Sequence, residues 1–233
     1  MNLAEKSYRH IRRQLTSGNL QPGSRLVNRT LADEIGVSVI PVREALNRLA
    51  SEGLVEQFPG VGIFVRNLDR DELDHMYVLR DALESCAAAE AARHITEIQL
   101  EELEAILSEA DIVAKKIAAS TKGRATNKQF NVWLDLEEQF HLLLIEASRN
   151  PLLIKVINEH RAIREVFEAQ RNKPELLTTE TAQQTCHGKA ELIKALKDRN
   201  AELARKLISD QIQSGRRSVL SYFRKHGTGS PNA

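Results

Sequence analysis

Three side chains in the second half of the chain have the types needed for acid–base chemistry. Glu137 and His141 are four residues apart, which places them on the same face of a helix, and His187 follows in a later segment. Carboxylates and imidazoles are the commonest general acids and bases in proteins. No Ser/His/Asp constellation, phosphate-cradling glycine loop or cofactor fingerprint accompanies them. We therefore expect no enzyme activity.

The cysteines and the N-terminal segment point to an ordinary intracellular protein. Cys86 and Cys186 lie in helix-like contexts without a CxxC spacing, so neither a disulfide framework nor a zinc site is predicted. The opening MNLAEKSYRHIRRQL lacks an apolar signal core, and the sequence contains no run of about 18 apolar residues. We expect a cytoplasmic location and no membrane partner.

Charge is distributed unevenly along the 233 residues, although the formal net charge is only +1. Residues 1–66 hold nine basic and six acidic side chains, and eight of the nine basic ones are arginine. A guanidinium donates a planar fork of hydrogen bonds that suits phosphate oxygens. This distribution favours contact with nucleic acid, although solvated helix faces would give the same count.

The order of elements in the first 66 residues is typical of a winged helix-turn-helix domain. Asn28 is the expected N-cap of the second helix, and Pro59-Gly60-Val61 is expected to join two strands as a hairpin. A small helical domain that only packs against the rest of the chain is the alternative. The predicted elements are helices over 3–17, 28–36 and 40–51 and strands over 54–58 and 62–66.

The rest of the chain is predicted to be a separate all-α antiparallel bundle, which makes the fold class mostly α. A DNA-binding domain over 1–66 is expected to be followed by a linker at 67–71, the bundle at 72–225 and a disordered tail at 226–233. No strand pattern interrupts the bundle. Its six expected helices span 73–94, 97–119, 128–148, 151–171, 175–197 and 201–223.

Specific stretches resemble a known family. GNLQPGSRL, LADEIGVSVIPVREALNRLASEGLV and PGVGIFV closely resemble the DNA-binding domain of GntR-family bacterial transcription regulators, over roughly residues 5–66. RDALESCAAAEAA, FHLLLIEASRNP and IKALKDRNAELARKLISDQI resemble the FCD effector domain of the FadR subfamily. Six helices, rather than seven, favour the VanR-like subgroup.

The resemblance implies a homodimer that reads a palindromic double-stranded DNA operator. Arg29 and Arg43 match arginines that touch DNA in the family, and Arg43 is well placed for a guanine edge or a phosphate. Ser38 can donate to a phosphate, and Gly60 at the wing tip allows close approach of the backbone.

Two residues of the DNA-reading segment depart from the family pattern. Val39 and Ile40 stand where relatives usually carry an arginine followed by threonine or another polar residue. Apolar side chains can contact a thymine methyl group, which predicts an operator with different, A·T-richer positions. Internal packing of Val39 and Ile40 against the domain or the wing is the alternative.

The effector domain also departs from its family pattern. Many FCD domains bind a divalent metal through one acid and three histidines, and the metal holds a carboxylate-bearing effector. Glu137 and His141 match the acid and the first histidine, whereas the other two histidine positions fall on Lys189 and Gln211. A lysine must lose a proton before it can bind a metal, and an amide is a weak ligand. We predict that the metal is absent or loosely bound; if it is present, Glu137 and His141 hold it.

Lys189 is a candidate for the positive charge that the metal would supply. It shares a helix face with Ile193 and Leu196, and it would either pair with Glu137 or hold the carboxylate of the effector. A solvated lysine on a slightly rotated helix is the alternative. His187 lies about 200° around the same helix and is expected to point elsewhere.

Arg80 is the other inward-facing cation, by helical phase and by its match to the R-x-x-L-E motif of the family. Its buried guanidinium requires an anionic partner, either Glu84 or an acidic effector. Arg161 and Arg164 have ambiguous phases. The predicted effector-binding residues are Arg80, Glu137, His141, Lys189 and Gln211.

The predicted function is a dimeric transcription regulator, most often a repressor in this family, that responds to a small organic acid. The alternative is a ligand-independent DNA-binding protein whose helical domain only dimerises. The sequence does not identify the operator, the regulated genes or the effector.

Overall fold

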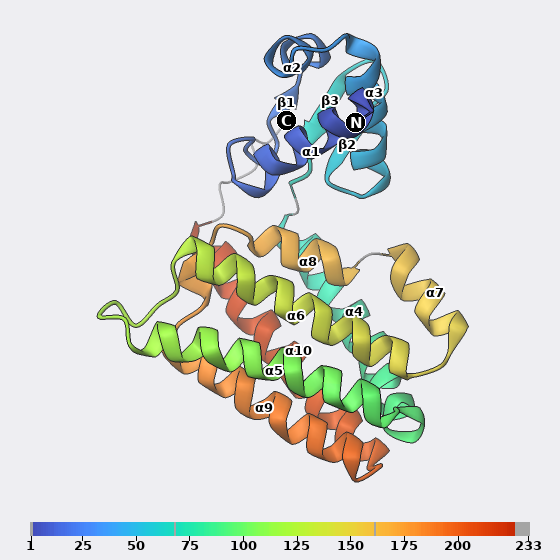
Figure 1. The fold of residues 1–233 in the computed structure, drawn as a ribbon, viewed down its shortest axis with the longest axis vertical. Coiled ribbons are helices and arrows are strands. Elements are labelled where there is room, and N and C mark those ends of the chain that lie inside the picture. The colour runs from blue at the N-terminus through green and yellow to red at the C-terminus, as the bar shows by residue number, and fades with distance from the viewer. Residues whose placement is uncertain (1, 68, 161, 227–233) are drawn as a thin grey trace. The chain divides into compact units, whose positions relative to one another are not determined.

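The computed structural model describes residues 2–67, 69–160 and 162–226. The chain divides into two compact units, residues 1–68 and 69–233, which are described separately here. The predicted class is confirmed: the first unit has helices and a small sheet, and the second is helical (Figure 1). Within the described residues, no helix combines the length and apolar character needed to cross a bilayer.

Three helices form most of the first unit: α1 (Leu3–Thr16), α2 (Asn28–Ile35) and α3 (Val39–Ser51). Gly36 ends α2 with φ 73°, a left-handed conformation that glycine adopts at little cost. The predicted N-cap at Asn28 is wrong, because Val27 is the extended residue before the helix and Asn28 is its first residue.

A three-stranded antiparallel sheet completes the first unit, with strand order β1-β3-β2. The hairpin of β2 (Val55–Phe58) and β3 (Gly62–Val65) was predicted. The short strand β1 (Arg25–Leu26), which pairs with β3, was not, because two residues carry no alternating pattern. The helices and the sheet share one apolar core, which includes Tyr8, Ile11, Leu31, Ile35, Val42, Leu46, Leu49, Val55 and Val65.

In the second unit, α5, α6 and α9 lie side by side in Figure 1. Helix α4 packs against α6, α8, α9 and α10. Its alanine-rich stretch is fully buried, which allows neighbouring helices to approach closely. The elements are α4 (Arg70–His94), α5 (Glu97–Ala118), α6 (Asn127–Ala147), α7 (Pro151–His160), α8 (Ala162–Gln170), the 3-10 helix η1 (Pro174–Leu176), α9 (Thr179–Lys197) and α10 (Ala201–His226).

Helix α4 begins earlier than predicted. The Asp69 side chain accepts hydrogen bonds from the backbone amides of Asp71 and Glu72, and the Glu72 side chain accepts one from the Asp69 amide. This capping box makes residues 70 and 71 the first turn of α4, although they were expected in a linker. The tail expected over 226–233 lies outside the described residues from 227 onwards, and α10 extends to His226.

One helix was predicted over residues 151–171. Helices α7 and α8 occupy this range on either side of residue 161, which lies outside the described residues, so the continuity of the predicted helix stays a prediction. Counted on either side of residue 161, the described part of the second unit has seven α-helical segments.

Candidate nucleic-acid interface and effector site

The N-terminal end of α3 presents an apolar tip to solvent. Val39 is 38% exposed and Ile40 68%, whereas Pro41 and Val42 are buried. Ser38 precedes the helix in an extended conformation, and its side chain makes no capping hydrogen bond, so the hydroxyl is available to another partner. Because Ile40 is largely exposed, packing inside the domain does not account for the apolar residue at this tip.

Arg29 and Arg43 differ from most other cations of the first unit. Both side chains are exposed, and the described part of the chain provides neither with a hydrogen bond or ion pair. Phosphate or base contacts would therefore not compete with an internal partner. The other cations have internal partners in several cases: Arg9 with Glu5, Arg48 with Glu5 and Glu52, Arg66 with Glu56, Lys6 with the Ile35 carbonyl and Arg25 with the Val61 carbonyl.

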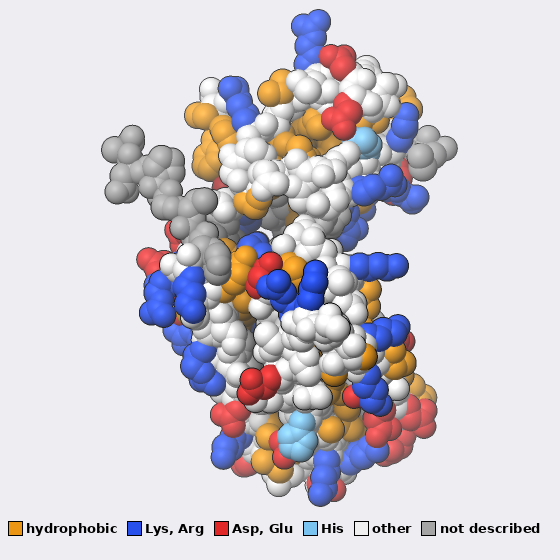
Figure 2. Space-filling view, turned by 90° about the vertical axis from the view of Figure 1, so that its left-hand side faces the viewer, with side chains coloured by type: hydrophobic (Ala, Val, Ile, Leu, Met, Phe, Trp, Pro, Cys, Tyr) orange, Lys and Arg blue, Asp and Glu red, His pale blue; other side chains and the backbone are white. Residues whose placement is uncertain are grey.

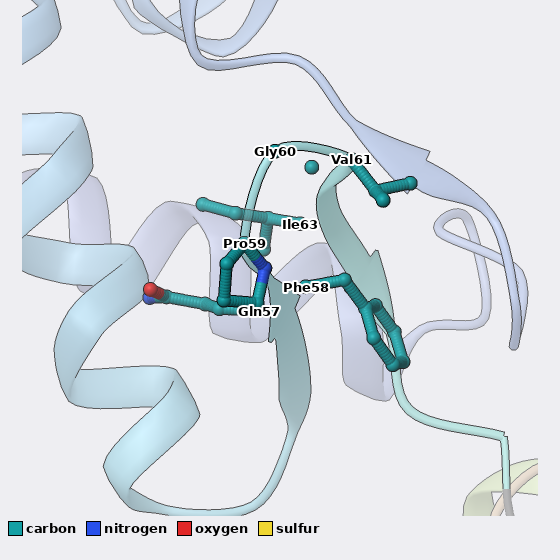
Figure 3. Close-up of a pocket in the computed structure, with 7 residues that line it drawn as sticks. Gln57, Phe58, Pro59, Gly60, Val61 and Ile63 are labelled. Carbon is teal, nitrogen blue, oxygen red and sulfur yellow. The ribbon is translucent and has the colours of Figure 1, made fainter.

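The hairpin tip is a tight turn at Pro59 and Gly60 (Figure 3). The Val61 amide donates to the Phe58 carbonyl at 3.0 Å, and Gly60 has φ 76°, which is the third-position geometry of a type II turn after Pro59. Gly62 has φ 146°, and a Cβ added there would lie 2.9 Å from Nε of Arg25. The side chain of Arg25 thus lies against the turn and holds its shape.

A buried ionic chain crosses the helical unit from α4 to α6. Nε of Arg80 donates to Oε1 of Glu84 at 2.6 Å, and the other oxygen of Glu84 bonds Nδ1 of His141. All three residues are at most 5% exposed. The Arg80 guanidinium also lies 4.8 Å from the ring centre of Phe167. Glu84 is therefore the internal partner that a buried Arg80 requires.

Ionisation in this chain follows from burial and from the neighbouring charges. Burial alone would raise the pKa of Glu84, but the charge of Arg80 and the hydrogen bond with His141 outweigh it and lower the pKa to about 2. Burial lowers the pKa of His141; Glu84 opposes this shift, the cations Arg80 and Lys189 add to it, and the pKa ends below its ordinary value. We therefore assign a neutral imidazole that donates from Nδ1 to Glu84 and keeps a lone pair on Nε2.

Lys189 lies at the other end of this cluster and is 1% exposed, as its helical phase predicts. Its Nζ lies 3.4 Å from Oε2 of Glu137 and 3.6 Å from the ring centre of Phe140. Oε2 of Glu137 also lies 4.0 Å from Nε2 of His141. Burial lowers the pKa of Lys189, whereas Glu137 opposes this shift. The ion pair is the arrangement that stabilises a charged lysine at this depth.

Within the described part of the chain, three of the predicted effector-binding residues have a buried atom without a hydrogen-bond partner: Nζ of Lys189, Oε1 of Glu137 and Nε2 of Gln211. The Lys189–Glu137 pair has a short distance but not the angles of a hydrogen bond. Leaving such a group unsatisfied costs about 1–3 kcal/mol. These atoms belong to three of the five residues that the sequence assigns to effector binding.

The four residues at the metal-ligand positions of the family do not fit a divalent metal. Lys189 and Gln211 replace two imidazoles, and the ammonium of Lys189 lies beside the carboxylate that would otherwise bind the ion. Across residues 2–67, 69–160 and 162–226, no cluster of three or more His, Cys, Asp or Glu side chains could hold a metal ion. In this site the ammonium of Lys189, rather than a metal ion, supplies the positive charge.

Comparisons with known proteins agree with this two-part organisation. A family model described as "Bacterial regulatory proteins, gntR family" matches residues 3–65, and one described as "FCD domain" matches residues 75–214. The chain belongs to the GntR family and carries an FCD domain.

Relatives of this GntR-family chain are named as transcription regulators. The HTH-type transcriptional regulator McbR of Escherichia coli (strain K12) is 31% identical over 149 residues, 64% of this chain and 62% of that protein. The HTH-type transcriptional repressor RspR of the same strain is 29% identical over 144 residues, 62% of this chain and 58% of that protein. The matched part of the chain thus spans about three fifths of these relatives.

A solved structure of E. coli McbR/YncC covers 96% of this chain and 99% of that one with a TM-score of 0.68 and 24% identity. The two chains share a fold. These relatives are regulators rather than enzymes, in agreement with the expectation of no enzyme activity.

Other polar residues of the GntR-family chain lie outside the buried cluster. The side chain of His187 is 77% exposed and pairs with Glu191, so it joins neither Glu137 nor His141. The half-exposed side chain of Arg164 pairs with Glu138, and Arg161 lies outside the described residues.

Sequence reasoning did not predict the contact between Glu84 and His141. The two residues are 57 positions apart on different helices, so no local pattern relates them.

Proposed function

We propose that this GntR-family protein is a DNA-binding transcription regulator that binds a palindromic operator as a homodimer. The observation that carries the proposal is the state of Arg29 and Arg43, which are exposed and without internal partners in the described structure. Free guanidinium groups beside an exposed helix start are what phosphate and guanine contacts need. Ser38 and Gly60 add a hydroxyl donor and a bare backbone at the wing tip.

The half-site is expected to be read partly through apolar contacts. Val39 and Ile40 extend from the same helix start as Arg43, and neither can hydrogen-bond a base edge through its side chain. The matching feature of a base pair in the major groove is the thymine methyl group. The expected half-site therefore combines a guanine or phosphate contact by Arg43 with one or more A·T pairs. On the face of the protein drawn in Figure 2, Lys and Arg side chains are scattered among acidic and hydrophobic ones.

The helical unit is proposed to bind a small carboxylate-bearing effector that alters operator affinity. Lys189, Gln211 and Glu137 each carry a buried polar atom without a partner, and buried polar groups are rarely left so. Arg80 is an indirect contributor, because Glu84 already occupies its guanidinium. Repression is the expected sign of regulation, as in the name of RspR.

Operator selection from a random duplex pool tests the proposal. The full-length protein is expected to enrich an inverted repeat, and its affinity for that duplex should change when organic acids are added. A pool that remains random after selection would contradict the DNA-binding role. Affinity that is unaffected by every acid would favour the second candidate, a ligand-independent regulator whose helical unit only dimerises.

A further inference from the structure

Among the described residues of the helical unit, three of the four buried side-chain atoms without a hydrogen-bond partner belong to residues assigned to effector binding, and they come from three different helices. Nζ of Lys189 belongs to α9, Oε1 of Glu137 to α6 and Nε2 of Gln211 to α10. The first and third are donors, and the second accepts when Glu137 is ionised. Lys189 is 1% exposed, so bulk solvent does not satisfy its ammonium. A bound molecule with complementary polar groups would satisfy these buried atoms.

Lys189 contacts Glu137 directly, and Gln211 lies against the residue before Lys189. Lys189 Nζ lies 3.4 Å from Oε2 of Glu137, which leaves the other carboxylate oxygen free. The Gln211 side chain lies against Gly188, the residue before Lys189: a Cβ added at Gly188 would meet Nε2 of Gln211 at 3.4 Å. The absent side chain at Gly188 therefore leaves room for the carboxamide beside α9.

We propose that this site binds, without a metal, a small carboxylate whose adjacent carbon carries a hydrogen-bond donor. The Lys189 ammonium and the Gln211 amide donate to the carboxylate of the ligand, and Oε1 of Glu137 accepts from its 2-amino or 2-hydroxy group. An ammonium–carboxylate contact is a strong, charge-assisted one, so Lys189 takes over the role of a bound cation. The inference rests on the proposed effector role of the helical unit and adds the chemical class of ligand.

Charge balance distinguishes the two forms of this ligand. Arg80 is paired with Glu84, and Lys189 with Glu137, while the His141 imidazole is neutral. An amino acid zwitterion adds no net charge to the cluster, whereas a hydroxy acid adds one negative charge. Because an uncompensated charge is costly to bury, the amino acid is the favoured form.

Metal content tests whether Lys189 and Gln211 stand at ligand positions. The full-length wild type and the double variant Lys189→His with Gln211→His are incubated with Ni²⁺, desalted and analysed. The wild type should retain no nickel, and the variant about one ion per chain, since two new imidazoles join Glu137 and His141. A wild type that retains one ion per chain, or a folded double variant that retains none, would overturn the proposal.

Matched acids test the ligand class in metal-free wild-type protein. Propionate, lactate and alanine differ only in the 2-substituent, as do succinate, malate and aspartate. Alanine should raise Tm by roughly 3 °C or more at millimolar concentration and lactate by less, aspartate should likewise raise Tm more than malate, and the unsubstituted acids should not raise it. Lys189→Met should abolish this difference, while Lys194→Met, at an exposed lysine of the same helix, should preserve it.

Three outcomes would contradict the ligand class: equal shifts with the unsubstituted acids, shifts that require added metal, and no shift with any substituted acid. Operator binding by the ligand-free protein is measured separately. If operator binding is intact but the substituted acids do not raise Tm as expected, only this inference is contradicted. If operator binding itself fails, the proposed function is lost whatever the acids do.

Discussion

Glu84 joins the two halves of the buried ionic chain, so its charge has a direct consequence for stability. Changing Glu84 to Gln would leave the Arg80 guanidinium buried without its anion. Removing one partner of a buried pair costs about 3–5 kcal/mol of unfolding free energy. Glu90→Gln on the same helix is the control, because its partner Arg93 is exposed and such pairs contribute about 0–1 kcal/mol. Urea denaturation measures both, and equal effects would contradict the account.

The pKa of Glu84 also sets the pH range over which its ionised form stabilises the folded protein. Its folded-state pKa of about 2 lies below the ordinary glutamate value of about 4.3. The stability that its ionised form contributes is therefore complete above about pH 4.3 and is lost as the pH falls towards 2. The difference in unfolding free energy between wild type and Glu84→Gln should therefore become smaller as the pH falls through that range. A difference that stays constant down to the acid end would show that Glu84 is already protonated in the folded state.

The predicted contact of Val39 and Ile40 with thymine methyl groups can be tested in the operator. Replacing individual thymines of the selected operator by uracil removes a methyl group and leaves every hydrogen-bonding group in place. At the thymine facing Ile40, uracil should weaken binding of the wild type about 3- to 10-fold. Ile40→Ala should bind the thymine and uracil duplexes alike. Uracil at a flanking position outside the repeat is the control, and wild-type affinity that is unchanged at every thymine would rule out methyl recognition.

Residue burial was the most predictable feature of the helical unit. Arg80 and Lys189 are buried as their positions in the 3.6-residue repeat predict, because phase on a helix is a local property. The Glu84–His141 hydrogen bond was not predicted, because tertiary packing alone brings together residues so far apart. Which atoms of Glu137, Lys189 and Gln211 remain unpaired likewise depends on the packing of three helices.

The side chain of Arg199 connects the junction that follows α9 to the end of α4. Arg199 follows α9 with φ 54°, and its Nη1 donates to the carbonyls of Ala92 and Ile95 at the end of α4. Arg199→Ala removes these bonds and should cost about 1 kcal/mol. Arg199→Gly loses the same bonds but relieves the left-handed conformation, so it should be about 1 kcal/mol more stable than Arg199→Ala.

Arg149 provides the matched control for Arg199. It has φ 52°, but its side chain makes no hydrogen bond within the described residues. Arg149→Ala should therefore be nearly neutral, and Arg149→Gly should stabilise the protein by about 1 kcal/mol. Thermal and urea unfolding of the four variants would separate the lost bonds from the backbone effect. Identical behaviour at the two sites would show that Arg199 does not support α4.

Elements with strong local signals were predicted well. The hairpin was marked by Pro59-Gly60, and helix ends by Gly36 and by Asn150-Pro151. Strand β1 is two residues long and exists only through its pairing with β3, so no pattern in the sequence could reveal it.

At the scale of the whole molecule, the proposed assembly is a two-fold dimer on a two-fold operator. Sedimentation should give a mass of about 52 kDa, twice the 26.2 kDa of one chain. A duplex with one intact and one scrambled half-site should bind at least about 10-fold more weakly than the inverted repeat. A monomer that binds both duplexes equally would contradict the proposal of paired half-sites.

Arg43 tests the central claim most directly, because its exposed and unpaired guanidinium is assigned to the operator. The measurement is the anisotropy of the labelled, selected operator titrated with wild type, Arg43→Ala and Arg9→Ala. Arg9 already pairs with Glu5, so its loss should matter little. Arg43→Ala should weaken binding by about 1–3 kcal/mol, or roughly 5- to 150-fold in Kd. Unchanged affinity for Arg43→Ala, in a variant that is folded and dimeric, would contradict the assigned role of α3 in reading DNA.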